Sequence, residues 1–147
     1  MKPSTWLRAL AGCLALFAVG HTLGTAVPHA ATSPRQAAVL AAMRNSQFPV
    51  MGFTRSYWDF YYGFALIISV HLALLAVIAW QAGAVSRRNA EAALPLAYTL
   101  LVGSFVTLVI CYRFFFSAPI AMSAAAVVCS VGSVWALRVE RGRKMAS

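Results

Sequence analysis

Acidic side chains are scarce in this sequence, since only three of its 147 residues are Asp or Glu. Lys and Arg number twelve, so the formal net charge is +9, yet charged residues make up only 10% of the chain. A soluble domain carries about 25% charged residues, and 61% of this chain is hydrophobic. The composition therefore excludes an ordinary soluble domain and indicates an integral membrane protein.

Several chemical signatures are also missing. The three cysteines, an odd number, form no CxxC and no zinc spacing, which excludes a disulfide framework. No phosphate-binding loop, nucleotide fingerprint or Ser/His/Asp arrangement is present. The basic side chains lie mainly between and beyond apolar segments, where they orient membrane helices and meet anionic headgroups. We therefore expect membrane lipids as partners, and no nucleic acid, metal or cofactor.

Four apolar segments are long enough to cross a bilayer as helices. They cover residues 6–27, 57–81, 94–113 and 118–137. The expected fold is all-α, a single four-helix transmembrane domain formed by residues 1–147. The first segment also resembles a signal peptide, with Gly24-Thr25-Ala26 as a cleavage site. We favour a retained helix because three further spans follow it.

The longest connection, residues 28–56, carries the signals of a short helix. Ser33 is placed as its N-cap, Pro34 as its first residue and Gln36 as the closing member of a capping box. Three apolar side chains then share one face: Val39, Leu40 and Met43. We expect an amphipathic helix on the membrane surface that ends before Pro49.

Four spans place both chain ends on one side of the membrane. That side, which includes the predicted linker Gly83–Ala93, collects eight Lys and Arg, and the other side holds four. The positive-inside rule therefore predicts an inner-membrane protein with both termini in the cytoplasm and the long loop outside. Three tryptophans fall at the predicted inner ends, as in an aromatic belt: Trp6, Trp80 and Trp135.

Four ionisable residues are candidates for a site at the outer end of the bundle. His21 lies within a GxxxG spacing, Gly20–Gly24, and should face the bundle interior because burial of an ionisable group is costly. Arg55 precedes Asp59 by four residues, the spacing of a helical ion pair. Arg113 ends the third span at the level of Asp59, so we expect the four to converge. Three candidate ligand-binding tyrosines lie nearby: Tyr57, Tyr61 and Tyr62.

The same residues also have purely structural interpretations. Asp59 and the arginines can be interfacial anchors that satisfy one another and the headgroups, and the GxxxG spacing favours intramolecular packing over homodimerisation. His71 lies deeper, and we expect it to hydrogen-bond Ser104 or Thr107. Because the depths of His21 and His71 differ by about 10 Å, the pair fits poorly as axial ligands of a haem.

The segment Gly52–Phe64, GFTRSYWDFYYGF, together with Met43 and Gly20–Gly24, resembles a family of small bacterial four-span membrane proteins with no assigned activity. The resemblance implies the same four-helix architecture in a bacterial membrane. In size and layout the chain is also distantly similar to DoxX-like four-helix proteins, which is an analogy of architecture alone.

Two classes of function stay open. The first is a binding or accessory protein that holds a lipid, a quinone or a partner helix at its aromatic outer end, as a homo-oligomer or with a partner membrane protein. The second is a small membrane enzyme that uses His21 and Asp59 as acid and base on a lipid-like substrate, with Arg55 or Arg113 on its anionic headgroup. We favour the first because no nucleophile, metal or cofactor motif supports the second.

Overall fold

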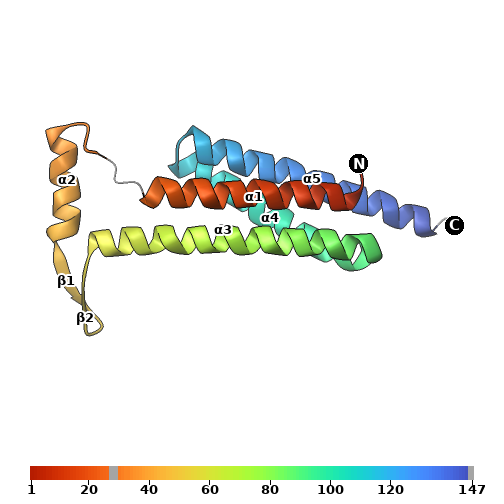
Figure 1. Ribbon diagram of the computed structural model, residues 1–147, viewed down its shortest axis with the longest axis horizontal. Helices are drawn as coiled ribbons and strands as arrows, with labels where there is room; N and C mark the ends of the chain where they lie inside the picture. The colour runs from red at the N-terminus through yellow and green to blue at the C-terminus, as the bar shows by residue number, and fades with distance from the viewer. Residues whose placement is uncertain (27–29, 146–147) are drawn as a thin grey trace. The chain divides into compact units, whose positions relative to one another are not determined.

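The computed structural model describes residues 1–26 and 30–145, which are almost entirely helical (Figure 1). In chain order the elements of these residues are α1 (Pro3–Ala26), α2 (Pro34–Asn45), β1 (Gln47–Val50), β2 (Phe53–Ser56), α3 (Tyr57–Arg88), α4 (Ala90–Phe114) and α5 (Ser117–Met145). Helices α1, α3, α4 and α5 are each long and apolar enough to cross a membrane. The chain is therefore an all-α, multi-pass membrane protein, as predicted. Val27, the predicted end of the first span, lies outside the described residues.

The chain divides into two compact units. Unit 1 comprises Met1–Phe17 and Leu72–Ser147, and unit 2 comprises Ala18–His71. Unit 1 contains α4, α5 and parts of α1 and α3, whereas unit 2 contains α2 and the hairpin with the adjoining parts of α1 and α3. A single domain over residues 1–147 stays a prediction.

Small residues let the helices of unit 1 pack closely. Buried residues recur on α4 at intervals of three and four: Ala90, Ala93, Ala97, Leu100 and Ser104. The buried set on α5 has the same spacing: Ser123, Ala126, Ser130, Ser133 and Leu137. Such spacing places each set on one face of its helix. The two faces pack along the α4–α5 pair, where the hydroxyl oxygens of Ser104 and Ser130 lie 3.4 Å apart.

Two glycines of unit 1 face α1, and one of them limits how closely α1 can approach. A Cβ added to Gly83 of α3 would lie 3.5 Å from the Cβ of Leu7, in ordinary contact. A Cβ added to Gly132 of α5 would lie 2.5 Å from the Trp6 ring, closer than van der Waals contact permits. The indole of Trp6 therefore occupies the space that any larger residue at position 132 would need.

The glycines of α1 itself do not make such close approaches. A Cβ added to Gly12, Gly20 or Gly24 would meet nothing within 4 Å, and all three residues are exposed. The expectation of close packing through the GxxxG spacing is therefore wrong. Besides Trp6, Cys13 of α1 contacts α5: its thiol sulfur lies 3.5 Å from the carbonyl oxygen of Met122.

Helices α3 and α4 are joined by a single residue, Asn89. The predicted linker Gly83–Ala93 is instead helical on both sides of Asn89, and Gly83 lies within α3. The side-chain oxygen of Asn89 accepts a 3.0 Å hydrogen bond from the amide of Ala92 and so caps α4. Because α4 begins at Ala90 and not at residue 94, Pro95 lies inside the helix, beyond its first turn.

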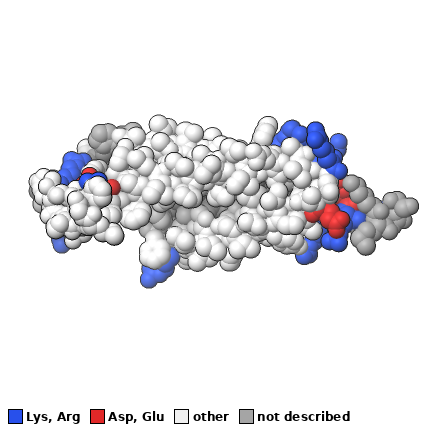
Figure 2. Space-filling view, turned by 90° about the horizontal axis from the view of Figure 1, so that it is seen from below, with Lys and Arg blue, Asp and Glu red and all other residues white. Residues whose placement is uncertain are grey.

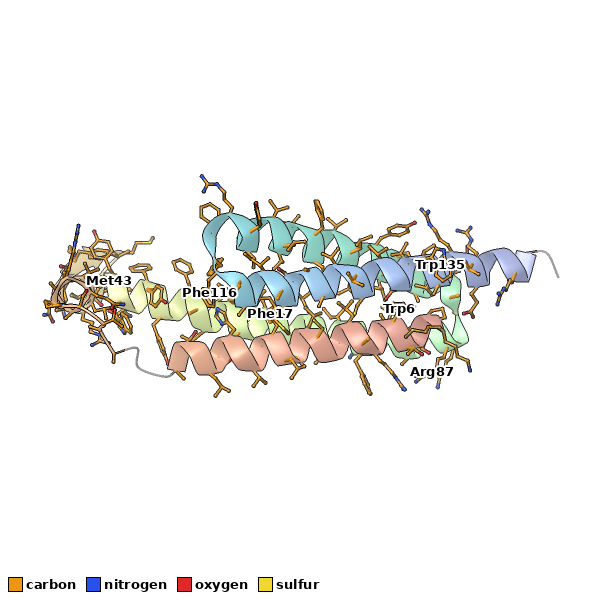
Figure 3. All side chains as sticks on the ribbon, turned by 90° about the horizontal axis from the view of Figure 1, so that it is seen from above. Trp6, Phe17, Met43, Arg87, Phe116 and Trp135 are labelled. Carbon is orange, nitrogen blue, oxygen red and sulfur yellow. The ribbon has the colours of Figure 1, made fainter. Side chains whose placement is uncertain are left out.

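Apart from Arg113 in the last turn of α4, the charged side chains of unit 1 gather at the end where α1 begins (Figures 1 and 2). There Arg141 pairs with Glu91 at 3.2 Å, the one ion pair in the described part of the chain. Trp6 and Trp135 lie toward the same end as Arg87 (Figure 3). This arrangement of unit 1 is compatible with a tryptophan belt at one depth of the membrane.

A β-hairpin that was not predicted from the sequence follows α2. Strands β1 and β2 pair antiparallel, with Val50 opposite Phe53. The two loop residues, Met51 and Gly52, have φ angles of 47° and 87°, as a two-residue type I′ turn requires. Met51 is 95% exposed at the tip.

The predicted helix after Ser33 is confirmed as α2. The Ser33 hydroxyl oxygen accepts a 3.2 Å hydrogen bond from the Gln36 amide. The side-chain oxygen of Gln36 accepts a 2.7 Å bond from the amide of Thr32, so the capping box closes one residue earlier than expected. Of its three apolar side chains, Leu40 and Met43 are half-buried, whereas Val39 is exposed. The apolar face is therefore small.

Candidate functional site

Asp59 caps helix α3. The Ser56 amide donates a 2.7 Å hydrogen bond to a carboxylate oxygen of Asp59, and the Ser56 hydroxyl donates a 3.0 Å bond to the same oxygen. In return the Asp59 amide donates to the Ser56 hydroxyl at 3.2 Å. These reciprocal bonds form a capping box, with the carboxylate at the positive end of the helix dipole. The sequence carries the signal of this box, Ser56-Tyr57-Trp58-Asp59 before an apolar run.

Arg55 does not form the expected helical ion pair with Asp59. It lies in strand β2, and α3 starts only at Tyr57, so the geometry of residues four apart on one helix is absent. Its guanidinium donates a 2.8 Å hydrogen bond to the carbonyl of Thr54 and lies 5.2 Å from the centre of the Phe53 ring. Arg55 is thus held beside an exposed aromatic ring.

Aromatic rings from the hairpin and from α3 contact one another at the start of α3. The ring of Phe48 in β1 lies 4.8 Å from that of Tyr57 and 5.9 Å from that of Phe60, measured between centroids. Two further ring pairs follow along α3: Phe60 with Phe64 at 6.3 Å, and Trp58 with Tyr61 at 5.5 Å. These separations are those of stacked and edge-to-face pairs. The hairpin is therefore attached to α3 largely through Phe48.

A second arginine, Arg44, contacts one of these aromatic rings. The guanidinium of Arg44, at the end of α2, lies 4.5 Å from the centre of the Trp58 ring, which is a cation–π distance. We call the following set the aromatic mouth: Arg44, Phe48, Phe53, Arg55, Tyr57, Trp58, Phe60 and Tyr61. Tyr57, Tyr61 and Phe53 each expose more than half of their surface. The mouth is thus an accessible surface and not an enclosed pocket.

His21 has a hydrogen-bond partner on another helix. Its Nδ1 lies 3.0 Å from the hydroxyl oxygen of Ser69 on α3. This partner is two residues before His71, about 3 Å along the axis, so the expected depth difference of about 10 Å between the two histidines is wrong. Ser69 is ten residues beyond Asp59 on the same helix, which separates the two by about 15 Å along the axis. His21 and Asp59 therefore do not meet around a small shared ligand, and the geometry does not favour an acid–base pair.

Two predicted site residues remain, Arg113 and Tyr62. Arg113 belongs to unit 1, where its guanidinium lies 5.5 Å from the Phe114 ring centre, so its convergence with Asp59 stays a prediction. Tyr62 is exposed on α3. Over residues 1–26 and 30–145, no group of three or more His, Cys, Asp or Glu side chains could hold a metal ion.

The prediction for His71 is wrong. Its Nδ1 lies 2.7 Å from the carbonyl oxygen of Ile67 in its own helix, and the residue is exposed. The two hydroxyls expected to pair with it are engaged elsewhere, Ser104 with Ser130 and Thr107 with a carbonyl of α4. His71 is therefore on the outer side of α3 and is not a packing histidine.

Unit 1 contains a small cavity of about 40 Å³ between its four helices. Its apolar lining comes mainly from α1 and α3: Leu14, Phe17, Leu72 and Leu75. Its hydroxyl groups come from α4 and α5: Thr99, Ser104, Thr107 and Ser123. Each of these hydroxyls already has a hydrogen-bond partner in the protein. Since pockets for organic ligands measure about 300–1,000 Å³, the cavity is too small for a quinone or lipid.

Comparison of this chain with known protein families, curated proteins and solved structures finds no match. Its function is therefore inferred from the composition, the fold and the aromatic mouth.

Proposed function

We propose that this protein is a bacterial inner-membrane binding or accessory protein that holds a ligand at its aromatic mouth. A lipid, a quinone or a partner helix would each suit an exposed aromatic surface at the end of a membrane helix. Among these an anionic lipid fits best, because guanidinium groups bind phosphate oxygens bidentately and aromatic rings favour the headgroup level. The observation that carries the proposal is the placement of Arg44 and Arg55 beside the rings of Trp58 and Phe53.

The charge balance of unit 2 supports an anionic ligand. Its charged residues are three arginines and a single acid, Asp59. The carboxylate of Asp59 accepts both of its described hydrogen bonds from Ser56. Neither Arg44 nor Arg55 forms an ion pair with a carboxylate in the described residues. Both guanidinium groups are therefore available to a phosphate.

Native mass spectrometry of the purified protein tests this proposal. We expect bound phosphatidylglycerol in preference to the zwitterionic phosphatidylethanolamine. A basic residue near a membrane surface contributes about 1 kcal/mol toward anionic lipid, so Arg44→Gln and Arg55→Gln should each weaken lipid binding about fivefold. Arg35→Gln is the matched control, since it removes the same charge from α2 outside the mouth. Equal loss in all three variants, or no preference for the anionic lipid, would contradict the proposal.

The orientation is part of the same proposal. Both termini lie on the side with the larger number of Lys and Arg, eight against four, which is the cytoplasmic side under the positive-inside rule. The aromatic mouth then faces the outside of the inner membrane. A reporter enzyme that works only in the cytoplasm, fused after Ser147, should be active. A silent fusion, with a periplasm-active reporter working at the same position, would reverse the orientation.

A further inference from the structure

The exposed face of α3 around His71 is apolar apart from the imidazole. Ile67 and Phe64, four and seven residues before His71, are 51% and 61% exposed. His71 lies eleven residues after Phe60 and nine before Trp80 in an apolar run, so each end is about 15 Å away and the imidazole is near the bilayer centre. Ionisable residues at that depth almost always face protein or a water-filled cavity, and lipid seldom surrounds them.

One ring nitrogen of His71 has no partner in the described residues. Nδ1 lies 2.7 Å from the Ile67 carbonyl oxygen, to which it donates when it carries the proton. Nε2, on the opposite side of the ring, is then an acceptor with an unused lone pair. In the other tautomer Nε2 carries the proton and is a donor. Nδ1 is then an acceptor, so this ring turns away from the Ile67 carbonyl, which keeps its helical hydrogen bond. Two neutral His71 rings can therefore bond to each other, with one as donor and one as acceptor.

We propose that α3 is a dimerisation helix, in which His71 hydrogen-bonds His71 of a second copy of this chain across a parallel, two-fold symmetric contact. The seam consists of residues spaced by four, three and four positions: Phe60, Phe64, Ile67 and His71. This is the spacing of knobs-into-holes packing, and a single polar residue in such a seam fixes register and oligomeric state.

A second copy is the occupant that this surface fits. The partner must present a hydrogen-bonding group at the bilayer centre within an apolar surface. Between Gly63 and Trp80 the polar residues are Ser69 and His71, and Ser69 is buried and bonded to His21. A two-fold axis parallel to α3 places each residue opposite itself at the same depth, so His71 meets His71 of the other copy, the outward polar residue of this stretch of α3. Phe60 belongs to both the seam and the aromatic mouth. The hydrogen bond of His71 lies about 15 Å further along α3 and needs no ligand at the mouth.

Fluorescence energy transfer between labelled copies in liposomes of phosphatidylethanolamine and phosphatidylglycerol tests the hydrogen bond. We expect a dimer whose fraction rises with the protein-to-lipid ratio. His71→Leu should lower the association constant about threefold to twentyfold, the range of one interhelical hydrogen bond in a membrane. His71→Asn, whose amide both donates and accepts, should retain the dimer. A monomeric wild-type protein, or an unchanged association constant for His71→Leu, would overturn the proposal.

Cysteine cross-linking in the same liposomes tests the seam without relying on His71 variants. In a background that carries alanine at positions 13, 111 and 129, Ile67→Cys should form disulfide-linked dimers on mild oxidation. Leu66→Cys is the control, since it is exposed at nearly the same depth but lies about 100° around the helix. Equal cross-linking at both positions would contradict the proposed seam. A dimer that is abolished by Gly20→Leu but retained with His71→Leu would mean that α1 forms the interface, and would also contradict it.

Discussion

Unit 1 and unit 2 are stabilised by different kinds of contact. In unit 1 the helices are fixed by steric fit, as at Trp6 against Gly132 and along the small residues of α4 and α5. In unit 2 the contacts are directional: the capping box of Ser56 and Asp59, and the aromatic and cation–π pairs of the mouth. A steric fit fails when an atom is added, whereas a cap fails when a single polar atom is removed. Substitutions that add an atom should therefore destabilise unit 1, and substitutions that remove a polar atom should destabilise unit 2.

The largest effect is expected from adding one methyl group to unit 1. Gly132→Ala places a Cβ against the Trp6 ring, and overpacking of this kind costs about 1–3 kcal/mol. The free energy of unfolding, measured by SDS titration in mixed micelles, should fall by that amount. Gly103→Ala is the control, since a Cβ there meets nothing within 4 Å. In a Trp6→Leu background the cost of Gly132→Ala should shrink, and an undiminished cost would show that the ring is not the cause.

Removal of the cap of α3 should have the next largest effect. Ser56→Ala deletes the hydroxyl that accepts from the Asp59 amide and donates to its carboxylate, and loss of an N-cap costs about 1 kcal/mol. Amide hydrogen exchange should rise at residues 57–60. Ser56→Thr keeps the hydroxyl and should retain protection, while Ser33→Ala should affect α2 alone. Unchanged exchange at residues 57–60 in Ser56→Ala would contradict the capping box.

A smaller effect is expected where a hydrogen bond joins two helices of unit 2. Ser69→Ala removes the partner of His21, and interhelical hydrogen bonds in membrane proteins average about 0.6 kcal/mol. The imidazole resonances of His21 should shift in the NMR spectrum. Ser123→Ala is the comparison in unit 1, because that hydroxyl bonds only to carbonyls of its own helix. An equal loss of stability in both variants would mean that the bond to His21 adds nothing.

The smallest effect is expected for Ser104→Ala in unit 1. The Ser104–Ser130 contact is long, at 3.4 Å, and the Ser130 hydroxyl keeps a 2.8 Å bond to the Ala126 carbonyl. We expect a loss below about 0.5 kcal/mol, since hydrogen bonds weaken with distance. The same SDS titration measures it. A loss larger than that of Ser69→Ala would show that polar contacts also stabilise unit 1.

Local and compositional signals predicted much of the fold. The four apolar runs predicted the spans because length and hydropathy suffice for a membrane helix. The Ser33 cap predicted α2 because capping depends on neighbours in sequence. The hairpin was missed because its turn places Met51, a residue with a Cβ, at positive φ. The joint at Asn89 was missed because Gly83 resembles a turn residue when its contact with α1 is unknown.

The candidate site was only partly predictable for a similar reason. Arg55, Tyr57 and Tyr61 were identified because they cluster in sequence. Phe48 and Arg44 were not, since only the hairpin brings them onto α3. The exposure of His71 also has no sequence signal, because an apolar membrane helix has no polar side to indicate which face meets protein. In such a helix the packing of neighbouring helices determines which face is exposed, and these helices are distant in the chain.

The contact between Arg44 and Trp58 gives the mouth its own optical reporter. The chain has four tryptophans, and Trp58 is the one that belongs to unit 2. With phenylalanine at the other three positions, all indole emission would come from a ring that a guanidinium covers at 4.5 Å. Any headgroup that draws Arg44 away from this ring changes the polarity around the indole and hence the colour of its fluorescence. The occupancy of the mouth could then be followed in real time, in a bilayer, without an added label.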